Sequence, residues 1–81
     1  FAKAVEINVH GDDVTPDWLQ TFEQTLTPWR KGAVPVVINY TKQQASGKIV
    51  LGEEWRVNPS DELMLALESM LGSTNVKIVF N

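Results

Sequence analysis

Three side chains near the end of the first expected strand are of types that bind metal ions. His10, Asp12 and Asp13 offer one imidazole and two carboxylates in a short stretch. Ligands this close in sequence do not easily surround one ion, and the sequence offers no second cluster to complete the shell. We therefore interpret this stretch as a solvated turn and predict no metal site.

Other catalytic arrangements lack essential residues. The chain has no cysteine, which excludes a thiol nucleophile, a disulfide and a Cys-based zinc site. Glu53 and Glu54 are expected on opposite sides of a strand, which separates a potential acid from a potential base. The glycines at 32, 47, 52 and 72 stand singly, so they form no phosphate-binding loop. We predict a non-catalytic module without cofactor-binding residues.

Composition narrows the classes of partner. Seven Lys or Arg stand against ten Asp or Glu, giving a net charge of -3 over 81 residues. Non-specific nucleic-acid binders need a basic field, which this chain lacks overall. No apolar run approaches the roughly 20 residues that span a bilayer, and no signal-peptide pattern occurs. We expect a cytoplasmic protein without membrane contact, and the start at Phe1 rather than Met suggests a piece of a longer chain.

The elements that must position any site follow from hydrophobic periodicity. Alternation predicts strands at 4–10, 34–41, 48–51, 54–57 and 76–80, and apolar stripes predict helices at 16–27 and 59–71. Burying two helical stripes against five one-sided strands predicts a single α+β domain. It should be a two-layer sandwich of order β-α-β-β-β-α-β, with both helices on one face of a mixed or antiparallel sheet.

Local signals mark the element ends. Thr15-Pro16 and Asn58-Pro59 each place a capping residue before a proline, which predicts two helix starts. Gly72 follows the last apolar residue of the second helix and predicts its end. The polar stretch 42–47 is expected to be a mobile loop at the tip of a hairpin.

Basic and aromatic residues on the expected strands suggest one alternative function. They could share one sheet face as a platform for single-stranded DNA, because bases stack on aromatic rings beside cations. The simpler interpretation is an ordinary solvated face, and we favour it. The residues are Tyr40, Lys42, Lys48, Arg56 and Lys77.

Four residues are better candidates for binding a protein partner. Leu65 falls on the polar side of the second helix, opposite its apolar stripe. Val79 faces away from Ile78 and Phe80 in the last strand, which could template a partner strand if it lies at an edge. Trp29 and Arg30, at the exit from the first helix, complete the set.

Two motifs in the chain are specific enough to compare with known families. The stronger is a Gly-x-x-Trp-Arg-Val-x-Pro-Ser-Asp run followed by a leucine-rich helix, Gly-Ser and a strand ending in Phe. It is matched by Gly52, Trp55, Arg56, Val57, Pro59, Ser60, Asp61, Leu63, Leu67, Leu71, Gly72, Ser73 and Phe80. The weaker, upstream motif is matched by Leu26, Pro28, Arg30, Gly32, Val34, Pro35, Val36 and Tyr40. Together the two motifs resemble the C-terminal end of the bacterial replicative DNA polymerase III alpha subunit.

The resemblance implies that residues 1–81 are one C-terminal domain of a larger polymerase subunit. It implies binding of the tau subunit of the clamp loader, which couples the polymerase to the replisome. The parent would be a DNA-directed DNA polymerase whose magnesium is held by acidic residues elsewhere, with no cofactor in this domain. A purely structural terminus and a single-stranded DNA-binding module remain the alternatives.

The last strand also resembles, loosely, the Gln-x-hydrophobic-x-Phe peptides that insert into the sliding clamp. Asn75 stands near the position of the Gln, but Phe80 is one residue too far along. Ile78 and Phe80 are also expected to be buried in the sheet. We therefore expect the sliding clamp to be a less favoured partner than tau.

Overall fold

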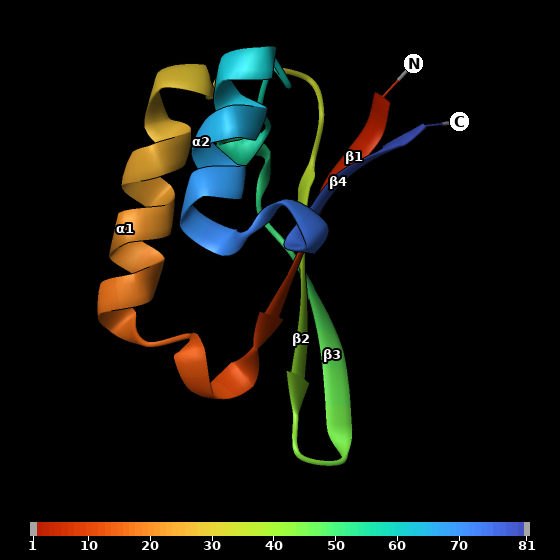
Figure 1. Ribbon diagram of the computed structural model, residues 1–81. Helices are drawn as coiled ribbons and strands as arrows, with labels where there is room; N and C mark the ends of the chain where they lie inside the picture. Colours follow the sequence, from red (N-terminus) through yellow and green to blue (C-terminus); the bar gives the residue numbers. More distant parts are fainter. Residues whose placement is uncertain (1, 81) are drawn as a thin grey trace.

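A four-stranded mixed sheet carries two helices on one of its faces in the computed structural model, which describes residues 2–80 (Figure 1). Four short 3-10 turns (η) connect these elements. In chain order the elements are β1 (Ala2–His10), η1 (Gly11–Asp13), α1 (Pro16–Leu26), η2 (Thr27–Trp29), β2 (Val36–Lys42), β3 (Ala45–Val50), η3 (Glu53–Trp55), α2 (Asp61–Leu71), η4 (Ser73–Asn75) and β4 (Val76–Phe80).

The strands lie in the order β3-β2-β1-β4. β1 pairs in parallel with β2, with Val5 opposite Val36, and α1 makes the crossover between them. β2 and β3 form an antiparallel hairpin, and β4 returns antiparallel to β1 with Val76 opposite Ile7. The predicted α+β class, with both helices on one face of a mixed sheet, is confirmed.

The core lies between the sheet and the helices, because every second strand residue points toward the helical layer. Phe22 and Leu26 of α1 meet Leu63 and Leu67 of α2 above these strand residues. The buried cluster consists of Val5, Ile7, Phe22, Leu26, Val36, Ile38, Val57, Leu63, Leu67 and Val76. The sequence patterns predicted the core-facing side of α1, α2, β1 and β2 correctly.

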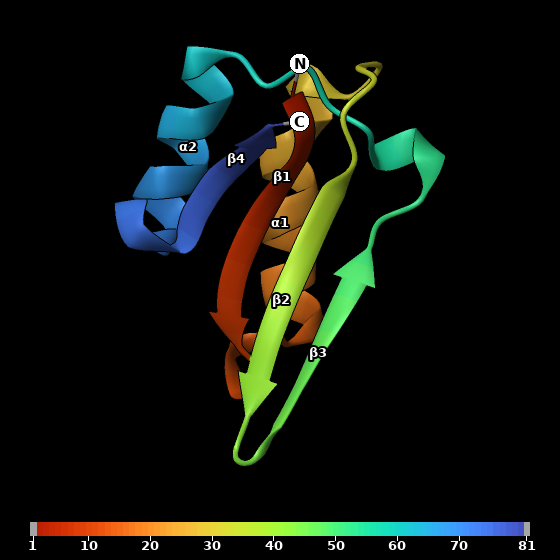
Figure 2. The same ribbon diagram turned by 90° about the vertical axis from the view of Figure 1, so that its right-hand side faces the viewer.

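The other side of the sheet, which we call the open face, has no helix over it (Figure 2). Register places Glu6 of β1 between Val37 of β2 and Lys77 of β4 on this face. The Asn39 side-chain amide donates to Glu6 Oε1 at 2.8 Å and to Asn8 Oδ1 at 3.3 Å. Polar side chains of β1 and β2 are therefore linked by hydrogen bonds on the open face.

The strand predicted at 54–57 does not form, so the sheet has four strands rather than five. Glu53–Trp55 makes a 3-10 turn, in which the Trp55 N–H donates to the Gly52 carbonyl at 2.9 Å. Only Val57 pairs in extended form, through an isolated bridge to Val34. The alternation of Trp55 and Val57 arises because the turn directs Trp55 back toward the core.

α2 begins two residues later than predicted. Ser60, not Asn58, is the N-cap, and its Oγ accepts from the Leu63 N–H at 3.2 Å. The cap predicted for the first helix is confirmed, because Thr15 Oγ1 accepts from the Trp18 N–H at 3.1 Å. Gly72 ends α2 with a φ of 92°, a conformation that favours glycine.

The segment 42–47 lies at the tip of a hairpin, as predicted, but most of it is paired strand rather than loop. The pairing of β2 with β3 continues to Lys42 opposite Ala45, which leaves a two-residue turn at Gln43 and Gln44. Of these two turn residues only Gln43 has a positive φ, 54°, as the first central residue of a type II′ turn does. The polar composition belongs to strand residues that face solvent.

The predicted burial of Phe80 is wrong, since 64% of this residue is exposed. Phe80 pairs with Ala2 at the far end of β4, beyond a register shift in β1. Figure 1 shows the ends of β1 and β4 leaning away from the helices, so little of the helical layer covers this end of the sheet. Ile78, two pairs further in, is half-buried.

Candidate protein-interaction surface

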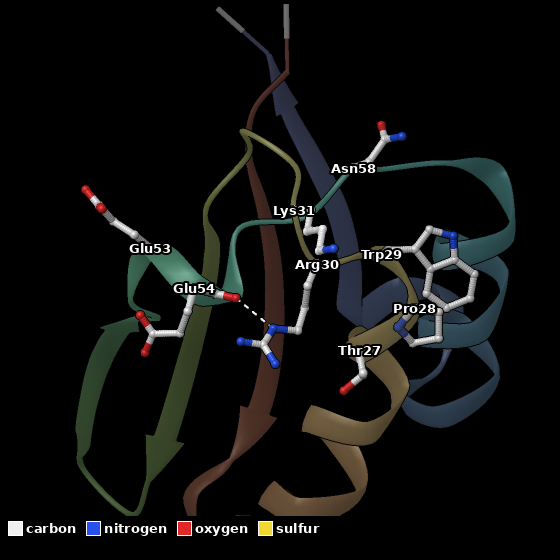
Figure 3. Close-up of a pocket in the computed structure, with 8 residues that line it drawn as sticks. All are labelled: Thr27, Pro28, Trp29, Arg30, Lys31, Glu53, Glu54 and Asn58. Carbon is white, nitrogen blue, oxygen red and sulfur yellow. Dashed lines mark hydrogen bonds between the residues drawn. The ribbon is translucent and has the colours of Figure 1, made fainter.

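A groove of about 830 Å³ opens between the end of α1 and the turn η3 (Figure 3). One wall comes from η2 and the two residues after it, and the other from η3 and Asn58. We call this hollow the groove. Its lining residues are Thr27, Pro28, Trp29, Arg30, Lys31, Glu53, Glu54 and Asn58.

Backbone hydrogen bonds hold the two walls side by side. The Asn58 N–H donates to the Trp29 carbonyl at 3.0 Å, and the Gly32 N–H donates to the Arg56 carbonyl at 3.3 Å. Val34 and Val57 then exchange two bonds, of 3.1 and 2.9 Å. This short ladder fixes the spacing of the groove without a regular strand.

The close approach of the walls depends on Gly32. A Cβ at this position would overlap the Val57 carbonyl and the Asn58 nitrogen. Lys31, just before it, has a φ of 54°, which turns the chain sharply after Arg30. A larger residue at position 32 would therefore push the two walls apart.

Arg30 joins the walls through its side chain. Its Nε–H donates to the Glu54 carbonyl at 2.8 Å, the bond drawn in Figure 3. Its guanidinium carbon lies 4.2 Å from the centroid of the Trp55 ring, a cation-π geometry. Arg30 is half-buried and held on two sides, so it shapes the groove more than it offers a free charge.

The rest of the lining is available to a ligand. Lys31, Glu53 and Glu54 are exposed, and the two carboxylates point away from the Arg30 guanidinium in Figure 3. Trp29 is half-buried and lines the groove. Aromatic surface beside charges of both signs suits a peptide with mixed polar and apolar side chains.

The four predicted partner-binding residues do not form one surface. Trp29 and Arg30 line the groove, whereas Leu65 lies on α2 and is 65% exposed, as predicted. Val79 lies on β4, an edge strand as its proposed role requires, and is half-buried opposite Ala4 on the open face. The structure thus offers the groove, the outer face of α2 and the β4 edge as separate surfaces.

The five residues considered for nucleic-acid binding do not share one sheet face, although the sequence pattern would have allowed it. Register places Lys48 and Lys77 on the open face, whereas Tyr40 alternates with Asn39 and lies on the helix side. Lys42 has the same phase as Tyr40 and pairs with Asp12 at 3.7 Å. Arg56 follows η3, outside the sheet. The two-residue hairpin sets this register, which the sequence reasoning had left open.

No group of three His, Asp or Glu side chains that could hold a metal ion occurs among residues 2–80. His10 ends β1, and Asp12 and Asp13 lie in η1. Within the same residues, no helix has the length and apolar character to cross a membrane.

Comparison with known families decides what kind of domain carries this groove. Residues 21–72 match the family model for the C-terminal domain of DNA polymerase III subunit alpha. This match covers more than half of the chain. The chain belongs to this family. The family match confirms the predicted resemblance, and with it that this is the C-terminal, non-catalytic part of a polymerase subunit.

Relatives extend the similarity to the whole chain. The DNA polymerase III subunit alpha of Vibrio cholerae is 36% identical over 81 residues, and that of Escherichia coli K12 is 31% identical over the same length. The subunit from Pseudomonas aeruginosa is 32% identical over 76 residues. The matches to the first two relatives cover 100% of the chain, and the match to the third covers 94%. The chain spans only a small part of each relative, 7% of the first two and 6% of the third. No solved structure matches the chain.

The span matched by the polymerase III alpha C-terminal family contains the whole groove. It runs from α1 to the end of α2 and leaves out β1 and β4. The two motifs that carry the resemblance meet here, since Arg30 of one packs on Trp55 of the other. The sequence did not predict Lys31, Glu53 and Asn58 as lining residues. The occurrence of two motifs of one family on either side of them was the signal that could have indicated a shared site.

Proposed function

We propose that this domain is a protein-interaction module that binds the tau subunit of the clamp loader. The observation that carries the proposal is the groove, which lies wholly within the family-matched residues and joins both motifs. Docking at this site would tie a polymerase to the rest of the replisome. The proposal assigns no catalytic or cofactor role to residues of this domain.

The chemistry of the groove supports a protein ligand. Trp29 and the Pro28 ring supply apolar surface, and Lys31 with Glu53 supplies free charges of both signs at its rim. Aromatic residues at the centre of a patch and charges at its rim are typical of protein interfaces. The Arg30–Trp55 contact keeps the walls in place before binding, which lowers the cost of ordering them.

A titration of the labelled chain with the C-terminal domain of tau tests the proposal. We expect the amide NMR signals of a contiguous patch that includes Trp29, Lys31 and Glu53 to shift. Lys31→Glu should weaken binding about fivefold or more, because it reverses a rim charge beside the ligand. Gln20→Ala, an exposed change on α1 outside the groove, is the matched control.

Two outcomes would count against the groove. If no signal shifts at up to about 100 μM tau domain, this domain does not bind tau with an affinity of functional strength. If the shifts instead map to α2 and Leu65→Asp abolishes binding while Lys31→Glu does not, the interface is the outer face of α2. Val79→Asp examines the β4 edge in the same way.

A further inference from the structure

The outer edge of β3 carries backbone groups without strand partners. β3 lies at one end of the strand order, and Figure 2 shows no element beside its outer edge. The Leu51 N–H donates inward to the Val36 carbonyl at 3.0 Å. Because hydrogen-bonding direction alternates along an antiparallel strand, Ile49 and Gly47 also face β2. The N–H and C=O groups of Ser46, Lys48 and Val50 therefore point away from the sheet.

Apolar side chains flank this edge on both faces. Val50, opposite Val37, lies on the open face and is 61% exposed. Ile49, opposite Ile38, lies on the helix side and is 43% exposed. No residue of β3 is buried, whereas each of the other three strands has at least one buried residue. A strand laid along this edge would cover apolar surface above and below the sheet.

A small hollow lies beside Ile49 on the helix side. It measures about 200 Å³ and is lined by Gly11, Val14, Ile38, Tyr40, Lys42 and Ile49. Mostly apolar walls at the margin of a sheet suit one branched apolar side chain from a neighbouring strand. Peptides that add to a sheet edge gain affinity from main-chain bonds and specificity from such pockets.

Lys48 determines the charge that this edge accepts. It is exposed, and its cross-strand neighbour is the neutral Asn39. Within residues 2–80 the only ion pair is Lys42 with Asp12, so Lys48 has no acidic partner there. A second copy paired about Lys48 would place two lysines opposite each other, which is destabilising. An acidic residue in that place is favourable.

We propose that the β3 edge binds an extended segment of a partner protein, with an acidic residue opposite Lys48 and an apolar residue directed into the hollow beside Ile49. The acidic residue is flanked in sequence by apolar or β-branched residues, because neighbouring side chains of a strand point to opposite faces. This surface shares no residue with the groove and does not depend on tau binding.

A capped synthetic peptide with the core Val-Ile-Glu-Val-Thr is the probe. Its central Glu meets Lys48 in either strand direction. On addition of the peptide to the ¹⁵N-labelled 81-residue chain, the amides of Ser46, Lys48 and Val50 should gain protection from hydrogen exchange. Those of Gly47 and Ile49, which already face β2, should change little. This alternation distinguishes strand addition from contact elsewhere.

Charge exchange tests the role of Lys48. A peptide with Lys in place of its central Glu should bind about fivefold more weakly or worse. Lys48→Glu should reverse that preference, whereas Lys3→Glu, an equal charge change at an exposed residue of β1, should leave it unchanged. If the peptide adds antiparallel to β3, methylating the nitrogen of its central Glu should abolish binding, while methylating that of the preceding Ile, which then faces away, should not. If it adds parallel, the two effects should be exchanged.

Three results would overturn the proposal. The first is unchanged protection of the Ser46, Lys48 and Val50 amides at millimolar peptide. The second is that the peptide with the central Glu still binds more tightly than the peptide with the central Lys after Lys48→Glu. The third is protection of these amides that rises with protein concentration in the absence of peptide, which would show a second copy at the edge.

Discussion

The guanidinium of Arg30 stacks on the ring of Trp55, and this contact joins two segments that lie far apart in the sequence. The same side chain donates Nε–H to the Glu54 carbonyl. A planar group that both stacks and donates from its edge is a property of arginine that lysine does not share. The groove is therefore built on a side-chain bridge as much as on backbone pairing.

Arg30→Lys should lower the free energy of unfolding by about 1 kcal/mol, because it loses the stacked guanidinium and the bond to Glu54. Urea unfolding followed by tryptophan fluorescence measures the change. Lys31→Ala, at the exposed neighbouring position, should stay within about 0.5 kcal/mol. Equal losses in the two variants would mean that the bridge does not stabilise the fold.

Gly32→Ala should destabilise the domain by about 3 kcal/mol, since the added methyl group meets backbone atoms of Val57 and Asn58 that cannot move aside. Thermal unfolding followed by circular dichroism gives the loss. Gly52→Ala is the control: there a Cβ would come within 3.0 Å of a Glu54 carboxylate oxygen only, which is the end of a flexible side chain. A mild effect at position 32 would contradict the close packing of the two walls.

Ser60→Ala should cost about 1 kcal/mol of stability, because the hydroxyl caps the Leu63 N–H at the start of α2. Asn58→Ala should cost much less, since Asn58 is exposed and does not cap the helix. Comparing the urea midpoints of both variants at an unchanged m-value separates the two positions. A larger loss for Asn58→Ala would place the cap where the sequence suggested it.

Gln43→Gly should stabilise the domain by roughly 0.5–1 kcal/mol, because a type II′ turn favours glycine at its first central position. Gln44→Gly should give no gain, since Gln44 does not have a positive φ. Differential scanning calorimetry would show a higher melting temperature for the first variant alone. No rise for Gln43→Gly would contradict this turn type.

A labelled single-stranded oligonucleotide should show no change in fluorescence anisotropy on addition of the chain at low salt. The chain is acidic overall, and Tyr40 and Lys48 lie on opposite sides of the sheet. Binding that weakens steeply as salt is added would instead support the nucleic-acid alternative.

The sequence predicted the fold class and the helical core face because these depend on periodicity, which single segments carry. Phe22 and Leu26 are buried as their stripe requires, and Thr15 caps as its position before Pro16 suggests. The five-strand count was wrong because residues 54–57 do not form a strand. Trp55 and Val57 have the spacing of a strand, but the 3-10 turn at Glu53 produces the same inward direction for Trp55.

The groove was only half predictable, because it depends on contacts between distant segments. Trp29 and Arg30 stand out as an aromatic residue and a cation at a helix exit. Lys31 and Asn58 become lining residues only when Gly32 lets the segment at Val57 approach. The side of the sheet on which Lys48 lies likewise depends on the two-residue length of the hairpin turn. The polar composition of residues 42–47 does not show where that turn falls.

The position of β1 in the sheet has a consequence for folding during synthesis. Its partners are β2 and β4, and β4 comes last of the four strands along the chain. As the chain emerges from a ribosome, one side of β1 has no partner until Val76 can reach Ile7. Non-local pairing of this kind folds slowly, and an unpaired edge is prone to association with other chains. The nascent domain thus completes its sheet, and covers this side of β1, only after its final strand has left the exit tunnel.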